Sequence, residues 1–327
     1  MIDAAIVGLG RWGRNFVRSV QGRSPRIRFV RAVDAAPDAA QDFAASHDLP
    51  LSADYASVLA DPRVGAVVLA TPHSAHHDQV LAAAAAGKHV FCEKPLALSA
   101  AHALDMLDAC RGAGVVLGVG HNRRLWPSVQ ELKRLVQSGA LGELLHLEGN
   151  HSNENSSKFT GTWRDSATES PGGGLTGAGL HVLDVFVDLA GPLKEVRGQL
   201  LRRKPPPAPL DAACLLLEFE GGVSGMLGTV RATPFYWRVH AFGTLASAES
   251  VGETELVVRR SGAQPERRML DPVDSLRGEL ESFADAVEGR AQLPISREQI
   301  LATMRAFEAA VQSLETGRGA VVAARSP

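Results

Sequence analysis

A lysine next to a proline carries the clearest chemical signal in this sequence. Glu93-Lys94-Pro95 comes directly after His89–Cys92, a short apolar stretch typical of a strand. Proline fixes the backbone and has no N–H to donate, so the chain turns away there. A partly desolvated ammonium group can release its proton and act as an acid or base. A surface ion pair at the end of a strand is the alternative, and the motif alone does not decide between them.

A histidine after a run of glycines is the second candidate. His181 follows Gly172–Gly179, a segment whose glycines would let a helix begin close to a ligand. Imidazole exchanges protons near neutral pH, so His181 is a candidate for proton transfer. A histidine that only starts a helix and bonds to backbone is the alternative.

Three glycines near the start have the spacing of a phosphate-binding loop. In Gly8–Gly13, the first glycine would allow a tight turn, Gly10 would let backbone approach a pyrophosphate, and Gly13 would let helix and strand pack. The amides at the start of the following helix attract phosphate. With a predicted strand before it and a predicted helix after it, the loop indicates a bound dinucleotide rather than an ordinary glycine-rich turn.

An acidic residue bears on the choice of cofactor. Asp34 ends the second predicted strand, where a carboxylate can accept hydrogen bonds from the adenosine ribose. Ala35 and Ala36 follow, so no adjacent basic residue could hold a 2′-phosphate, which Asp34 would also repel. We therefore expect NAD, with NADP less favoured. An aspartate that merely begins a turn is the alternative.

The first ~120 residues alternate short apolar stretches with alanine-rich helical ones, the pattern of a parallel sheet covered by helices. Strands are predicted at 4–7, 27–33, 66–70, 89–92 and 115–119, and helices at 14–21, 37–46, 76–86 and 100–112. The carboxyl ends of such strands face the ligand crevice. The glycine loop and Lys94 are both expected there.

The pattern changes after Val119. Helices are predicted at 127–137, 180–189, 275–288 and 297–315. Strands are predicted at 144–151, 196–201, 213–219, 223–230, 237–242 and 255–260. The polar segment 152–174 is either disordered or a functional loop. The proline-rich segment 204–209 is expected to be an exposed connection.

We therefore predict an α/β protein: an N-terminal Rossmann domain, 1–122, and a C-terminal α+β domain, 123–327, with an open, mostly antiparallel sheet. The length of 327 residues also favours two domains. The last helix, 297–315, is a candidate to pack back on the first domain. Because an open sheet face needs cover, we expect a homodimer or homotetramer.

Composition excludes some partners. With 34 basic and 36 acidic side chains the net charge is −2, whereas nucleic acid or an anionic membrane requires a basic excess. No segment is expected to span a membrane or to direct secretion. Cys92, Cys110 and Cys214 are scattered, so we expect reduced, buried thiols in a cytoplasmic protein.

Three neighbouring histidines raise the question of a metal. Zinc favours imidazole, but His73, His76 and His77 have no cysteine nearby and only Asp78 as an acid. We expect no metal. A polar loop beside the nicotinamide is the favoured interpretation, with His77 on the outer face of a helix.

Taken together, the motifs resemble the Gfo/Idh/MocA family of oxidoreductases over nearly the whole chain. The matching segments are Gly8–Gly13, 70–76, 87–90, Glu93-Lys94-Pro95, 120–124 and 172–184, and the Glu-Lys-Pro motif is the most specific. The resemblance implies a Rossmann domain followed by an α/β domain whose open sheet often mediates dimers or tetramers. It also implies substrates such as sugars, cyclitols and their derivatives.

The resemblance further implies roles for single residues. Lys94 would contact the reacting hydroxyl or carbonyl and share proton transfer with His181. The residues implied to bind the cofactor are Gly8, Gly10, Arg11, Trp12, Gly13, Asp34, Thr71, Pro72, His73, His76, Glu93, Lys94 and Asn122. The residues implied to bind substrate are Lys94, Arg123, Trp163, Arg164 and His181. From their polar side chains, His151, Asn153 and Asn155 are further candidates for binding hydroxyl groups.

One position departs from the family. Many members have an aspartate four residues before the histidine, where this chain has Gly177, which cannot carry a proton. Lys94 with His181 could suffice, Asp165, Glu169 or Asp184 could substitute, or activity could be altered or lost.

We expect a dehydrogenase or reductase that moves a hydride between the nicotinamide and a secondary alcohol or ketone of a sugar or cyclitol. NAD-assisted elimination or hydrolysis of a sugar derivative is one alternative. A catalytically silent dinucleotide or sugar sensor is the other, favoured by Gly177 and disfavoured by Lys94 and His181.

Overall fold

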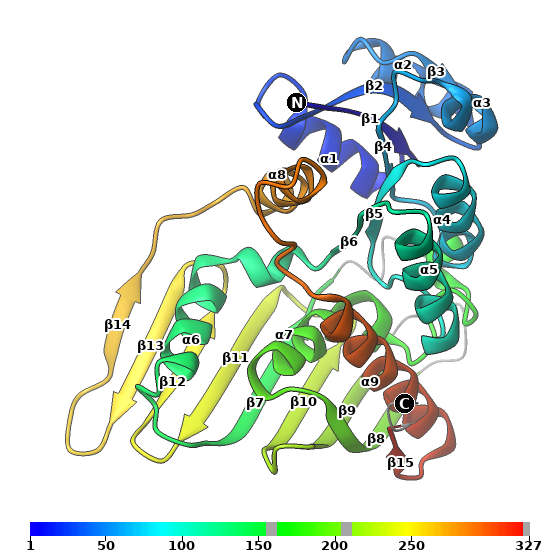
Figure 1. Ribbon diagram of the computed structural model, residues 1–327. Coiled ribbons are helices and arrows are strands. Elements are labelled where there is room, and N and C mark those ends of the chain that lie inside the picture. The colour runs from blue at the N-terminus through cyan, green and yellow to red at the C-terminus, as the bar shows by residue number, and fades with distance from the viewer. Residues whose placement is uncertain (155–161, 204–210, 323–327) are drawn as a thin grey trace. The chain divides into compact units, whose positions relative to one another are not determined.

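The computed structural model describes the chain except for residues 155–161, 204–210 and 323–327 (Figure 1). Asn155 and the proline-rich connection expected at 204–209 lie outside the described residues. The chain divides into two compact units. The first is Met1–Asn122 with Asp274–Arg297, and the second is Arg123–Val273 with Glu298–Pro327.

A six-stranded parallel sheet in the order β3-β2-β1-β4-β5-β6 forms the centre of the first unit. Its strands are β1 (Ile2–Val7), β2 (Ile27–Val33), β3 (Leu51–Ser52), β4 (Ala66–Leu69), β5 (His89–Glu93) and β6 (Leu117–Gly120). Strand β4 is buried along its whole length, as expected for a strand with helices on both faces of the sheet. The strand order reverses between β1 and β4, which opens a ligand crevice at their carboxyl ends. The predicted Rossmann architecture is confirmed.

Helices pack on both faces of this sheet. They are α1 (Arg11–Val20), α2 (Pro37–Ala45), α3 (Tyr55–Ala60), α4 (His76–Ala85), α5 (Ala100–Gly112) and α8 (Ser275–Val287). Helix α8 comes from late in the chain, yet its Leu280 and Phe283 belong to the core of the first unit, and Phe283 meets Phe91 edge-on at 5.7 Å. The division expected from sequence counted this helix with the second domain. Its apolar periodicity predicts a buried face, but it cannot show which sheet receives that face.

The second unit contains a nine-stranded sheet in the order β14-β13-β12-β11-β7-β10-β9-β8-β15. Its strands are β7 (Leu144–Ser152), β8 (Leu193–Arg202), β9 (Asp211–Phe219), β10 (Ser224–Val230), β11 (Tyr236–Gly243), β12 (Ala246–Val251), β13 (Glu255–Arg260), β14 (Glu266–Met269) and β15 (Ala320–Val321). Among these, β7 and β10 pair in parallel and the other neighbours are antiparallel, so the predicted open, mostly antiparallel sheet is confirmed. Strand β12 was not predicted, because Ala246–Val251 is poor in branched and aromatic side chains.

Helices cover one face of this second sheet. Figure 1 shows α6 (Pro127–Gln137), α7 (Leu180–Ala190) and α9 (Arg297–Thr316) on the same side of it. From Glu298 onward, α9 belongs to the second unit. Cys214 projects from the other face and is exposed, so the expectation of a buried thiol is wrong there, whereas Cys92 and Cys110 are buried. In the described part of the chain, no helix is long and apolar enough to cross a membrane.

Buried charges join the helices of the second unit. The guanidinium of Arg124 makes two 2.7 Å contacts with the carboxylate of Asp184 and a 2.9 Å contact with Asp188. Asp188 also accepts from Lys133 at 2.9 Å, and Asp184 accepts from the Thr303 hydroxyl at 3.2 Å. These side chains belong to α6, α7, α9 and the short turn Asn122–Leu125. One ionic cluster therefore links four segments of the unit.

Replacing Asp184 by Ala is predicted to reduce the free energy of unfolding by about 3–5 kcal/mol, because it leaves the Arg124 charge buried without its main partner. Urea unfolding followed by circular dichroism measures the change. The matched control is Glu218→Ala, which breaks the exposed ion pair with Lys194 and should cost about 0–1 kcal/mol. Equal losses in the two variants would show that the buried cluster is not a special source of stability.

Candidate active site

The glycine loop after β1 is built on contacts that no side chain would allow. A Cβ on Gly13 would lie 1.8 Å from the carbonyl oxygen of Gly8, so α1 packs directly on the turn. Gly8 has a φ of +93°, and a Cβ there would lie 2.7 Å from the Ala70 carbonyl oxygen. A Cβ on Gly10, in contrast, would meet nothing within 4 Å. The open space is at the start of α1, where helix amides favour phosphate, so these residues fit a dinucleotide.

Asp34 lies against this loop. One of its carboxylate oxygens accepts from the Leu9 N–H at 2.6 Å, and the other accepts from the Ala36 N–H at 2.9 Å. The carboxylate therefore stays beside the glycine turn at the carboxyl end of β2. Arg11 in the first turn of α1 is exposed, and the neighbouring Trp12 is half-buried.

The loop after β4 contains four of the expected cofactor residues. The Thr71 hydroxyl donates to the side-chain oxygen of Gln79 at 2.6 Å. His76 is fully buried, with Nδ1 3.0 Å from the Pro95 carbonyl oxygen and Nε2 3.2 Å from that of Thr71. His73 is also buried, and Pro72 is half-buried. The His76 ring thus connects this loop to the segment that follows Lys94. The sequence did not single out Gln79, since nothing in its spacing marks it.

Glu93 and Lys94 occupy the carboxyl end of β5, between the ends of β4 and β6. Both are buried, Lys94 with only 5% of its surface exposed. The Glu93 carboxylate accepts from the Lys94 N–H at 3.1 Å, and the Lys94–Pro95 peptide bond is cis. This burial argues against the alternative of a surface ion pair. Burial also raises the pKa of the neighbouring Cys92 thiol well above its usual value, so Cys92 is not a nucleophile at neutral pH.

Asn122 and Arg123 come at the junction of the two units. The Asn122 amide donates to the Ser275 hydroxyl at 3.0 Å, which connects the end of β6 to the start of α8 within the first unit. Arg123 belongs to the second unit, and its guanidinium carbon lies 3.9 Å from the centre of the Trp126 ring. The roles of Asn122 in cofactor binding and of Arg123 in substrate binding stay predictions.

The second unit brings two histidines together. His181 is the second residue of α7, and this helix directly follows the π-helical turn Leu175–Gly179. His151 lies near the end of β7. Both are 3% exposed, and their ring centres are 5.7 Å apart. Nδ1 of His151 is 3.0 Å from the Ala178 carbonyl oxygen. A carbonyl only accepts, so Nδ1 carries the hydrogen in this contact.

The position of the missing aspartate is open. Gly177 is exposed, and no atom of the described residues lies within 4 Å of a Cβ placed there, so these residues leave room for a side chain. Of the suggested substitutes, Asp184 is already bound by Arg124. Glu169 is at the border of burial, with 9% of its surface exposed, and the Asp165 side chain lies outside the described part. His151 is therefore the titratable neighbour of His181 that the structure adds.

The remaining candidates lie on a short helix, Trp163–Asp165. The Arg164 guanidinium carbon is 4.3 Å from the centre of the Trp163 ring, and the Arg164 carbonyl accepts from the Ser170 hydroxyl at 2.8 Å. Among the described residues, no group of three or more His, Cys, Asp or Glu side chains is arranged to hold a metal ion. His77 instead contacts Asp78 at 3.0 Å and Asp105 at 2.8 Å.

These features define a protein of the NAD-binding Rossmann class with a second α/β unit. Two family models match the chain: "Oxidoreductase family, NAD-binding Rossmann fold" over residues 2–121, and "GFO/IDH/MocA C-terminal domain" over residues 129–249. The chain belongs to the Gfo/Idh/MocA family of oxidoreductases.

Known proteins resemble it over different lengths. An uncharacterized oxidoreductase of Bacillus subtilis is 28% identical, over 97% of this chain and 95% of its own. The 2,7-anhydro-N-acetylneuraminate hydratase of Escherichia coli is 30% identical, over 73% of this chain and 64% of its own. The structure of levoglucosan dehydrogenase with NADH and levoglucosan has a TM-score of 0.87 at 23% identity, with 98% of this chain and 99% of that chain covered.

Proposed function

We propose that this protein is an NAD-dependent dehydrogenase or reductase acting on a secondary alcohol or ketone of a sugar, a cyclitol or a related polyol. The observation that carries the proposal is the burial of the Lys94 side chain at the carboxyl end of β5. Lysine is almost never fully buried unless it is paired, and a buried lysine next to a ligand crevice is a candidate for proton transfer. The levoglucosan dehydrogenase structure, whose ligands are NADH and a sugar, supports this class of reaction.

In this proposal the cofactor supplies the hydride chemistry and the protein residues manage binding and protons. The loop Gly8–Gly13 and the start of α1 would hold the pyrophosphate. Nζ of Lys94 would take the hydroxyl proton as a neutral amine during oxidation and so become an ammonium. That ammonium would return the proton during reduction. Glu93, next to Lys94 and also buried, would keep a negative charge near the ammonium and so balance it.

His181 is the second proton-carrying group of the proposal. Family members often have an acid at the position of Gly177, and His151 is the imidazole that lies next to His181 here. Arg123, Trp163 and Arg164 would bind substrate hydroxyl or acidic groups.

A transient redox reaction that ends in elimination or hydrolysis is the second candidate. The observation that favours it is the match to a hydratase at 30% identity, together with Gly177 in place of the usual acid. Such an enzyme would copurify with bound NAD and convert a sugar derivative without net NADH formation.

The first prediction concerns Lys94. Lys94→Ala should lower kcat by about 10²–10⁴-fold, the usual contribution of a general acid or base, while NADH still binds. A panel of polyols and sugars followed by NADH absorbance measures turnover, and NADH fluorescence measures binding. The exposed Lys194 provides the control Lys194→Ala, which should leave both unchanged. Unchanged turnover in Lys94→Ala would show that Lys94 takes no part in the mechanism. Conversion of a sugar by the wild type without net NADH formation would favour elimination or hydrolysis, the second candidate.

We further propose NAD rather than NADP as the cofactor. The Asp34 carboxylate lies beside the glycine turn, where a 2′-phosphate would meet its negative charge. Arg14 of α1 already donates to the Leu9 carbonyl at 2.8 Å and the Ala39 carbonyl at 2.9 Å.

The double variant Asp34→Asn with Ala35→Arg is expected to move the ratio of kcat/KM values toward NADP by about 10- to 100-fold, since a charge-assisted hydrogen bond contributes roughly 1.5–3 kcal/mol. An asparagine oxygen can still accept from the Leu9 N–H, so the loop should persist. Asp38→Asn, a change at an exposed residue of α2, is the control and should not alter the ratio. A wild type that already prefers NADP would contradict the proposal.

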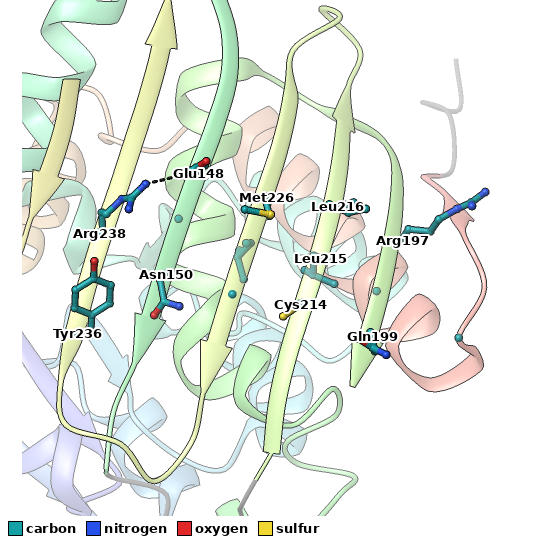
Figure 2. A pocket seen from close by; sticks show the side chains of 15 residues that line it. Glu148, Asn150, Arg197, Gln199, Cys214, Leu215, Leu216, Met226, Tyr236 and Arg238 are labelled. Atoms are coloured by element: carbon teal, nitrogen blue, oxygen red, sulfur yellow. Dashed lines mark hydrogen bonds and ion pairs between the residues drawn. The ribbon is translucent and has the colours of Figure 1, made fainter. Parts of the chain in front are cut away.

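The uncovered face of the second sheet is proposed to bind a second copy of the chain. A groove of about 650 Å³ runs across β8, β9, β10, β7 and β11, and its lining includes Cys214, Leu216, Met226 and Tyr236. Figure 2 shows these side chains on the face of the sheet. Leu216 is 59% exposed and Met226 46%. The Arg238 guanidinium at the edge of the groove is paired with Glu148 of the same chain, so its charge does not oppose contact with a like surface. Apolar patches of this kind usually mark protein interfaces.

A glutamate at Leu216 or Met226 should therefore reduce the molar mass in solution to that of a smaller species, because it places a charge in the proposed interface. Size-exclusion chromatography with light scattering gives the mass. Leu104→Glu, at an exposed leucine of α5 in the first unit, is the matched control and should not change it. A wild type that is monomeric at micromolar concentration would refute the proposed assembly.

We also propose that the protein works in the cytoplasm, on the basis of its cysteines. The three cysteines carry free thiols, as expected of a protein that works in the reducing cytoplasm. Its partner there would be a small sugar or polyol.

A further inference from the structure

A carboxylate that the sequence did not mark contacts the glycine turn that precedes His181. Asp211 is the first residue of β9 and is 8% exposed. Its Oδ1 accepts from the Gly174 N–H at 3.0 Å, and its Oδ2 lies 3.4 Å from Nε of Arg231. The Arg231 N–H also donates to the Asp211 carbonyl at 3.0 Å. One residue thus connects a glycine turn to the end of β10.

The turn at Gly173 and Gly174 packs closely against the Asp211 carboxylate. Gly173 has a φ of +63°, and a Cβ there would lie 2.8 Å from Oδ2 of Asp211. A Cβ on Gly174 would lie 3.0 Å from the Thr229 hydroxyl. Backbone, rather than side chain, therefore meets Asp211 at this turn. The turn leads directly into the segment Leu175–Gly179 and then into α7 with His181, so its position sets where that helix starts.

Arg231 links Asp211 to the segment that contains His151. Its backbone forms a bridge with Asn153, whose N–H donates to the Val230 carbonyl at 3.3 Å. Asn153 follows β7 and is two residues from His151. The Asp211 side chain thus contacts both the segment before His181 and the residue paired with the segment after His151.

We propose that Asp211 is a positioning residue for the histidine pair, acting through Gly174 and Arg231. This inference rests on the proposed function, since it assigns His151 and His181 a shared role in substrate binding and proton transfer. Both carboxylate oxygens face groups of the protein, so Asp211 supports the site without touching the reacting atoms. Displacement of a reacting group by about 1 Å can cost on the order of 10²-fold in rate.

The test compares two variants of Asp211. Asp211→Ala removes both contacts and should lower kcat by about 10- to 100-fold with a smaller change in KM for the polyol, because the histidines shift relative to the bound substrate. Asp211→Asn keeps an oxygen for the Gly174 N–H and loses only the charge toward Arg231, so it should recover part of the loss. Glu218→Ala, on the same strand but in an exposed ion pair, is the control and should match the wild type.

A second readout separates positioning from general stability. In ¹H–¹⁵N spectra of the imidazoles, assigned with His181→Gln and His151→Gln, the resonances of both histidines should shift in Asp211→Ala and not in Glu218→Ala. NADH affinity should stay constant, because the glycine loop belongs to the first unit. If Asp211→Ala does not fold, Asp211→Asn carries the same comparison with smaller shifts.

Unshifted imidazole resonances with unchanged kcat in either folded Asp211 variant would overturn the inference. Failure of the proposed function gives a result that can be distinguished from this one, because the wild type would then oxidise or reduce no polyol. The imidazole spectra would still show whether Asp211 positions the histidine pair.

Discussion

The contact of α1 with the turn after β1 is the constraint on which the first unit depends. Helix and strand meet there through backbone alone, since a Cβ on Gly13 would overlap the Gly8 carbonyl. That close approach aims the start of α1 at the carboxyl edge of the sheet and leaves open space beside Gly10. Asp34 then reaches the Leu9 N–H from the next strand. A nucleotide site follows from packing geometry before any specific side chain contributes to it.

The second unit has a buried ionic cluster in addition to its apolar core. Arg124, Asp184 and Asp188 are almost completely buried, and their contacts join three helices to the turn after β6. A buried ion pair is weak evidence for net stability, but the loss of one partner is costly. Asp184 lies one helical turn beyond His181, so the ionic cluster also limits how α7 can move. Asp184 therefore contributes both to the stability of the second unit and to the position of the helix that contains His181.

The chemistry at Gly177 is the point on which this protein differs from many of its family. A missing carboxylate lowers the number of groups that can accept a proton, and among the described residues no atom lies within 4 Å of a Cβ placed on Gly177. The imidazole of His151, whose Nδ1 lies 3.0 Å from the Ala178 carbonyl oxygen, is the side chain that the tertiary structure places next to His181.

The sequence by itself determined the parts that depend on local rules. Glycine spacing after an apolar strand, the Glu93-Lys94-Pro95 motif and the periodicity of most elements predicted the Rossmann unit, the open second sheet and the family, because backbone sterics and side-chain patterning act over a few residues. Tertiary structure alone decided that α8 completes the first core, that His151 meets His181, and that Asp211 and Gln79 support candidate site segments. Those contacts join residues far apart in the chain, and no local pattern encodes which distant side chain fills a given space.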